Sequence, residues 1–226
     1  MLVVFDLDGT LIDSRRDLAE SVNAFIVERG GQALPIDAVT AMVGEGAALL
    51  VRRALAAAGL EPDVTAALPR FLEIYDGRLL VHTQLYPGTR EMLDRLAPRS
   101  TLAVLTNKPQ HHTERILEGL EIRRYFSGVI GGDTPAGRKP DPSGLRSLMS
   151  HAGARREETT LVGDSAIDLR TARAAGTRIC LVRYGFGFSL AAGELTGDEQ
   201  IVDSPSEVAP LLLSARTTPG VTKPRA

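Results

Sequence analysis

The spacing of hydrophobic residues changes early in the chain. Residues 2–5 form an apolar run that is typical of a buried strand, and this run stops at two carboxylates, Asp6 and Asp8. From residue 14 to about residue 85, apolar residues such as Leu18 recur every three or four positions, and glycines and prolines separate the segments. The first pattern predicts a strand, and the second predicts a series of helices, the last of which is expected to be interrupted or loosened near Pro69 and Gly77.

Beyond residue 88, strand-like and helical segments alternate. Each apolar run is short, and a turn leads from it into a segment with helical periodicity. Alternation of this kind predicts an α/β fold, with a parallel sheet covered by helices on both faces. The expected helices cover 89–96, 112–120, 143–152 and 167–175, and the expected strands cover 102–106, 128–131, 160–163, 178–182 and 200–202.

The helical stretch near the N-terminus is too long for one crossover connection. A whole βαβ unit takes roughly 30 residues, whereas roughly a hundred separate the first two strand-like runs. We therefore expect a helical subdomain at 14–85, inserted into an α/β core made of residues 1–13 and 86–214. Residues 215–226 are rich in threonine, proline and basic side chains without periodicity, and we expect them to form a disordered tail.

The two acids that end the first run are candidate functional residues. Positions i and i+2 of a strand point to the same side, so Asp6 and Asp8 are expected to leave the sheet together. Two close carboxylates repel each other unless a cation lies between them or one is protonated. The alternative is a simple turn at Asp8-Gly9. Thr106 and Asp164 also end predicted strands, and ligands of parallel sheets bind at that edge.

Composition narrows the class of protein. The chain has 226 residues, 43% of them hydrophobic, and a formal net charge of −2, which suits a globular protein and predicts no nucleic-acid partner. The single cysteine, Cys180, lies in an apolar run and is expected to be a buried strand residue. No signal peptide and no membrane span is visible, so we expect no membrane partner and a cytoplasmic location.

Three further segments complete a pattern with the first acids. They are Thr106-Asn-Lys-Pro109, Arg138-Lys-Pro-Asp-Pro142 and Gly163-Asp-Ser-Ala-Ile-Asp168. Together with Asp6-Leu-Asp-Gly-Thr10, they resemble in type and order the four motifs of the haloacid dehalogenase-like phosphatase superfamily. The resemblance covers the chain from Leu2 to about Gly187. It implies a Rossmann-like core with an inserted α-helical cap.

Within the superfamily the chain looks most like the bacterial phosphoglycolate phosphatases. The segments that carry this resemblance are Val43-Gly-Glu-Gly-Ala47, Leu85-Tyr-Pro-Gly88, Thr106-Asn-Lys-Pro109, Val129-Ile-Gly-Gly-Asp133 and Val162-Gly-Asp-Ser-Ala-Ile-Asp168. The implied activity is Mg²⁺-dependent hydrolysis of a phosphomonoester, most simply 2-phosphoglycolate. The implied partner is a small phosphorylated metabolite, and the protein is expected to be a monomer or a homodimer.

The resemblance assigns the central roles to three acids. Asp6 is the expected nucleophile, which forms an aspartyl-phosphate and divides one hydrolysis into two easier steps. Asp8 is the expected proton donor to the leaving group and then the base for water. The expected Mg²⁺ ligands are Asp6, the backbone carbonyl of Asp8, and Asp164, which suit a hard cation that prefers oxygen.

The resemblance also assigns the surrounding roles. Lys139 is expected to supply positive charge to the phosphoryl group and the nucleophile, and Thr106 with the backbone of Asn107 to bind phosphoryl oxygens. Asp168 and Ser165 are expected to lie next to the metal site and to hold its ligands in place. The alternative for this last pair is a capping box, because the spacing Ser165-x-x-Asp168 also fits the start of a helix.

The cap is expected to read the rest of the substrate through residues Gly44, Glu45 and Gly46. A helix that starts there would offer free backbone N–H groups to a substrate carboxylate. The negative charge of Glu45 opposes an anionic substrate, and related phosphatases often have asparagine at this position. The hypothesis is therefore that Glu45 turns outward or pairs with Arg52 or Arg53.

Two other functions stay open at this point. The same chemistry could serve another metabolite, such as a sugar phosphate, a nucleotide or pyrophosphate. A non-catalytic module that uses the acids as a phospho-switch is a further alternative, although Asp8 and the long cap argue against it. A mutase is disfavoured because Gly163-Asp-Ser165 replaces the Glu-Asp-Ser that is typical of β-phosphoglucomutases.

Overall fold

Six parallel strands form the central sheet of the computed structural model, which describes residues 1–214. Their order is β5-β4-β1-β6-β7-β8, so the strand that carries Asp6 lies in the interior of the sheet. The predicted α/β fold is confirmed, whereas the predicted tail lies outside the described residues. The strands are β1 (Leu2–Phe5), β4 (Thr101–Leu105), β5 (Phe126–Ile130), β6 (Thr159–Gly163), β7 (Arg178–Val182) and β8 (Gln200–Val202).

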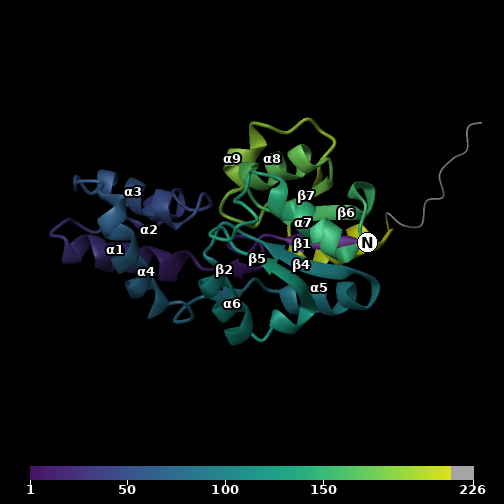
Figure 1. Ribbon diagram of the computed structural model, residues 1–226, viewed down its shortest axis with the longest axis horizontal. Helices are drawn as coiled ribbons and strands as arrows, with labels where there is room; N and C mark the ends of the chain where they lie inside the picture. The colour runs from purple at the N-terminus through teal and green to yellow at the C-terminus, as the bar shows by residue number, and fades with distance from the viewer. Residues whose placement is uncertain (215–226) are drawn as a thin grey trace, which may run out of the picture.

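Helices cover both faces of this sheet, as Figure 1 shows. Side chains of a strand alternate between its faces. Val3 and Phe5 therefore pack with α5, α6 and α10, while Leu2 and Val4 pack with α7 and α8. The helices of the core are α5 (Thr89–Leu96), α6 (Gln110–Gly119), α7 (Ser143–Ala152), α8 (Ala166–Ala175), α9 (Phe188–Ala192) and α10 (Pro205–Ser214). Single 3₁₀ turns at Ala97–Arg99, Arg123–Tyr125 and Arg156–Glu158 precede β4, β5 and β6.

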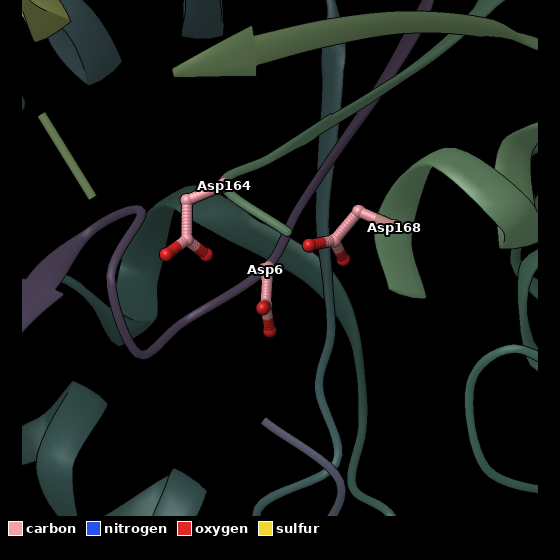
Figure 2. Close-up of side chains that lie close together, drawn as sticks. All are labelled: Asp6, Asp164 and Asp168. Atoms are coloured by element: carbon pink, nitrogen blue, oxygen red, sulfur yellow. The ribbon is translucent and has the colours of Figure 1, made fainter. Parts of the chain in front are cut away.

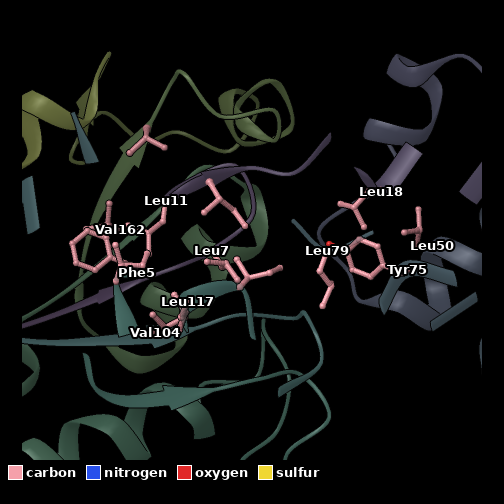
Figure 3. Packing of buried hydrophobic residues seen from close by; sticks show 14 of the residues in the cluster. Phe5, Leu7, Leu11, Leu18, Leu50, Tyr75, Leu79, Val104, Leu117 and Val162 are labelled. Carbon is pink, nitrogen blue, oxygen red and sulfur yellow. The ribbon is translucent and has the colours of Figure 1, made fainter. Parts of the chain in front are cut away.

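Four helices within residues 14–85 form a separate group beside the sheet (Figure 1). Their buried apolar residues belong to the same cluster as one face of the sheet, and Leu18, Leu50, Tyr75 and Leu79 lie close together within it (Figure 3). The predicted interruption near Pro69 does not occur, because α4 continues through Pro69 and ends before Gly77. The helices are α1 (Arg15–Glu28), α2 (Ile36–Thr40), α3 (Ala47–Ala57) and α4 (Val64–Asp76).

Two short strands join this helical group to the core. β2 (Ile12–Asp13) and β3 (Gln84–Leu85) pair antiparallel, so the outgoing and returning linkers lie side by side. The buried carboxylate of Asp17 accepts hydrogen bonds from the backbone N–H groups of His82 and Thr83, the latter at 2.7 Å. These contacts support our proposal that residues 14–85 form an inserted cap. In the described part of the chain, no helix is both long and apolar enough to cross a membrane.

Candidate active site

The three central strands bring the predicted site residues to one edge of the sheet. Phe5 is paired with Val104 of β4 on one side and with Val162 of β6 on the other. Because all three strands are parallel, the residues that follow them must meet at their carboxyl ends. Asp6 and Asp164 do so, and both are buried.

Three carboxylates converge at this edge, as Figure 2 shows. One oxygen of each of Asp6, Asp164 and Asp168 lies within 4.8 Å of the others. Burial, opposed by Lys139, raises the pKa of Asp6 to about 6. Burial and the neighbouring acids also raise the pKa of Asp164 well above its usual range. A divalent cation would remove this penalty, and hard oxygen ligands suit Mg²⁺. The residues present therefore fit the expected metal.

Two hydrogen bonds, one from the backbone and one from a side chain, hold the carboxylate of Asp164 in place. The N–H of Gly187 donates to it at 2.7 Å, and the hydroxyl of Thr10 donates at 3.4 Å. Gly9 has a φ of +83°, and a Cβ at Gly9 or at Gly185 would overlap the Asp164 side chain. Glycine is therefore required at both positions because the loops approach the carboxylate closely.

Lys139 lies between two of the acids. Its Nζ is 2.8 Å from Asp6 and 2.6 Å from Asp168, and the ammonium is buried. Burial alone would lower the pKa of Lys139, but Asp168 and Asp6 outweigh it and raise this pKa. Asp168 also accepts a 2.6 Å hydrogen bond from the hydroxyl of Ser165, in a complete capping box. The capping box is therefore present, and Asp168 also contacts Lys139, while the support of a metal site by Asp168 and Ser165 stays a prediction.

The carboxylate of Asp8 is not part of the cluster of three acids. It accepts a 2.5 Å hydrogen bond from the hydroxyl of Ser14 and bonds at 2.8 and 2.9 Å from the Nζ of Lys108. Because these partners occupy the Asp8 carboxylate, its orientation agrees with the expectation that Asp8 would contact the metal only through its backbone carbonyl. Lys108 was not predicted as a functional residue. Its presence in the quoted segment Thr106-Asn-Lys-Pro109 was the available signal.

Thr106 and Asn107 lie beside this lysine and connect the core to the cap. Both are buried, and the hydroxyl of Thr106 accepts from the backbone N–H of Lys108 at 3.3 Å. The side-chain amide of Asn107 donates to the carbonyl of Gly44 at 2.9 Å and to that of Lys139 at 3.0 Å. Asn107 therefore ties the cap loop to the loop that carries the buried lysine.

The cap loop covers a small cavity in front of the acids. Gly46 precedes the first turn of α3, and it lines this cavity together with Gly44 and Ala47. The cavity has a volume of about 60 Å³. Glu45 does not line it, and its carboxylate instead pairs with Arg53 at 2.5 Å. The structure thus agrees with the hypothesis that Glu45 turns away from the substrate.

Replacing Glu45 with glutamine is expected to have little effect on activity. The ion pair with Arg53 is well exposed, with side-chain exposures of 45% for Glu45 and 37% for Arg53. Such pairs contribute about 0–1 kcal/mol, so kcat/KM for an anionic phosphomonoester should change by less than about threefold. Steady-state kinetics would check this. A rise of tenfold or more would show that the charge of Glu45 acts on the substrate.

Mg²⁺ is expected to stabilise the folded protein, and more strongly at pH 7 than at pH 5. The folded pKa of Asp6 is raised to about 6, so without metal the folded state holds more protons than the unfolded state above about pH 4, and stability falls as pH rises through 6. Mg²⁺ binds the deprotonated acids and should add ~2.7 kcal/mol at a hundredfold excess over its Kd. Thermal denaturation with and without Mg²⁺ at both pH values measures this.

The matched variants for that experiment are Asp164→Asn and Asp203→Asn. Asp203 lies on the surface, where it pairs with Arg183, so its variant should keep the full Mg²⁺-dependent shift. Asp164→Asn should lose it. An equal shift at pH 5 and pH 7, or a shift that survives in Asp164→Asn, would contradict a metal site at these acids.

The fold and the acid cluster together define a class of hydrolase. Residues 3–182 match the family model of the haloacid dehalogenase-like hydrolases, and the chain belongs to this family. Its relatives include a phosphoglycolate phosphatase of Rhodospirillum rubrum, 43% identical over 192 residues, which cover 81% of this chain and 80% of that protein. Phosphoglycolate phosphatase 1 of Pseudomonas aeruginosa is 41% identical over 192 residues, with coverages of 82% and 70%.

A solved structure supports the same relationship. The crystal structure of a predicted phosphoglycolate phosphatase from Haemophilus somnus superimposes with a TM-score of 0.87 at 31% identity, covering 93% of this chain and 96% of that one. The resemblance recognised from the sequence motifs is therefore confirmed, and the chain is a hydrolase whose relatives are named phosphoglycolate phosphatases.

Proposed function

We propose that this protein hydrolyses 2-phosphoglycolate to glycolate and phosphate, with Mg²⁺ as cofactor and Asp6 as nucleophile. The observation that carries the proposal is the placement of Asp6. Its carboxylate lies at the centre of the sheet edge, 2.8 Å from the ammonium of Lys139 and in the same cluster as Asp164. A buried carboxylate beside a buried cation is suited to attack a phosphoryl group whose charge is neutralised nearby.

In the first step, a carboxylate oxygen of Asp6 attacks phosphorus and the bond from phosphorus to the glycolate oxygen breaks. Asp8 gives a proton to this leaving oxygen, so that glycolate departs as an alcohol and an aspartyl-phosphate remains. Lys139 offsets the charge that develops on the phosphoryl oxygens, and Asp168 holds its ammonium in place. The backbone N–H of Asn107 and the hydroxyl of Thr106 are the proposed donors to these oxygens.

In the second step, water attacks the phosphorus of the aspartyl-phosphate. Asp8 now accepts a proton from this water, and the bond to Asp6 breaks to release phosphate and restore the carboxylate. Asp6, Asp164 and the backbone carbonyl of Asp8 are the proposed ligands of Mg²⁺. The metal would supply positive charge to the phosphoryl oxygens and would reduce repulsion between them and the nucleophile.

The dimensions of the cavity support a compact substrate. A buried water needs roughly 10–15 Å³, so the cavity of about 60 Å³ takes only a small molecule while the cap is in this position. The N-terminus of α3 faces the same cavity and can receive a carboxylate, and the relatives at 43% and 41% identity are named as phosphoglycolate phosphatases.

The test is steady-state release of phosphate from a panel of phosphomonoesters, with Mg²⁺ and with a chelator. We expect metal-dependent turnover that is highest for 2-phosphoglycolate, compared with sugar phosphates, nucleotides and pyrophosphate. A maximum at a sugar phosphate would overturn the substrate and leave the mechanism standing. No turnover of any ester would overturn the proposed activity.

A further inference from the structure

One buried cation in the cavity has no part in the chemistry described so far. Among the described residues that line the cavity, Lys108 is the one with a basic side chain. Its side chain is only 3% exposed, and Lys139, the other buried lysine, is committed to Asp6 and Asp168. A buried ammonium normally has a specific partner, and Lys108 pairs with Asp8, the acid proposed to transfer the proton.

Its hydrogen bonds to Asp8 leave one N–H donor of the ammonium, and Tyr75 also interacts with this ammonium. Asp8 accepts from Nζ at 2.8 and 2.9 Å. These contacts use at most two of the three N–H donors of an ammonium. The ring of Tyr75, from cap helix α4, lies 4.9 Å from Nζ and covers it on the cap side. An aromatic face attracts a cation and excludes water, so the positive charge acts over a short distance within the cavity.

Lys108 lies on the side of the cavity where the carboxylate of the substrate, which does not react, is expected to bind. Asn107, its neighbour in the chain, is bound to the carbonyl of Gly44, so the Lys108 segment lies against the cap loop that begins α3. Val43, Leu50 and Phe71 also line the cavity, and they offer no polar side-chain groups. A carboxylate placed among them without a cation would pay a large desolvation cost.

The cations beside the acids point the same way. Lys139 contacts Asp6 and Asp168, and Lys108 contacts Asp8. A phosphoryl group would then be met by Lys139 and the metal. The carboxylate of the substrate adds a further negative charge. The ammonium of Lys108 and the N-terminus of α3 lie in the same cavity and would attract this charge.

We infer that Lys108 binds the carboxylate of the substrate and thereby determines specificity for phosphorylated hydroxy acids over neutral phosphomonoesters. This inference rests on the proposed function. It assigns Lys108 a second role in addition to its contact with Asp8. The same ammonium would contact both Asp8, which transfers the proton, and the carboxylate of the substrate. A lysine that only positioned Asp8 would act equally on every substrate.

The test compares two substrates of equal length, 2-phosphoglycolate and 2-hydroxyethyl phosphate, in which a neutral alcohol replaces the carboxylate. Wild type should prefer 2-phosphoglycolate in kcat/KM. Lys108→Met should lower kcat/KM for both substrates and should also lower the preference for 2-phosphoglycolate by about 10- to 100-fold, as expected for a lost hydrogen bond to a charged group. Lys108→Arg, which keeps the charge, should retain part of the preference.

Ser14→Ala is the matched control. It removes the 2.5 Å hydrogen bond to Asp8, and Ser14 does not line the cavity, so both substrates should slow by the same factor and the preference should stay unchanged. If Lys108→Met behaves like Ser14→Ala, Lys108 only positions Asp8 and the inference is overturned. Should Lys108→Met fail to fold, the ratio of kcat/KM for the two substrates can be measured with Lys108→Gln instead.

The outcome also separates this inference from the proposed function. A wild-type preference for 2-phosphoglycolate that survives in Lys108→Met and Lys108→Gln overturns the inference and leaves the proposed substrate in place. A wild-type enzyme that hydrolyses both esters equally well overturns the proposed substrate and, with it, the need for a carboxylate-binding residue.

Discussion

Replacing Asp6 with asparagine is expected to reduce hydrolysis of 2-phosphoglycolate by roughly four orders of magnitude or more, because an amide cannot form the aspartyl-phosphate. The effect should appear in kcat and not only in KM, since a neutral side chain also repels the substrate less than a carboxylate does. Phosphate release under saturating Mg²⁺ and substrate measures it. Turnover within tenfold of wild type would mean that another group attacks phosphorus.

The fold should survive this substitution, which makes the loss of activity interpretable. Asparagine has almost the same shape as aspartate, and Lys139 keeps its 2.6 Å contact with Asp168. Burial disfavours the charge of Asp6, as its raised pKa of about 6 indicates, so removing that charge should not lower the midpoint of thermal unfolding without metal. Asp203→Asn on the surface is the control for both measurements and should resemble wild type.

Lys139→Met is expected to remove activity and to destabilise the fold as well. Lys139 is the buried cation between Asp6 and Asp168, and Asp168 is fully buried. Breaking a buried ion pair by removing one partner typically costs about 3–5 kcal/mol, because the other charge is left without compensation. Urea denaturation without divalent metal measures this loss. A destabilisation below about 1 kcal/mol would show that water or rearrangement compensates the acids.

A second substitution tests the cause of that destabilisation. In Lys139→Met combined with Asp168→Asn, the uncompensated charge of Asp168 is gone, while an amide oxygen can still accept from Ser165 at the start of α8. The double variant should therefore recover part of the stability lost in Lys139→Met, and the two effects should not add. Activity should not recover, because the phosphoryl group still lacks the ammonium.

The local pattern of the sequence predicted most elements of the fold. The 3.6-residue period between 14 and 85 gave helices where the structure has α1 to α4, and the short apolar runs gave the strands of the sheet. The elements that were missed are weak in sequence. β2 and β3 have two residues each and exist because they pair with each other, and Pro210 interrupts the helical signal of α10.

The error at Pro69 has a related cause. Proline lacks the N–H that a helix interior needs, so a break was predicted there. In the structure, Phe71 and Tyr75 of the same helix are buried in the cap core, and Phe71 packs against Phe25 with ring centroids 6.2 Å apart. Burial of these aromatic side chains outweighs the loss of one backbone hydrogen bond.

What the sequence by itself determined is the chemistry available at the sheet edge. Asp6, Asp164 and Thr106 each follow a strand, and parallel strands necessarily end together, so their meeting could be predicted from order and spacing alone. The motifs of the haloacid dehalogenase-like hydrolases add Lys139 and Asp168 at known places along the chain.

The tertiary structure alone decided how these charges are paired. The contacts of Lys139 with both Asp6 and Asp168, and the contact of Lys108 with Asp8, join residues that are distant in sequence. An ionisable side chain in a motif has no fixed partner, because its lowest free energy depends on burial and on the charges that the fold brings within a few ångströms. Those distances exist only once the cap and the sheet have packed together.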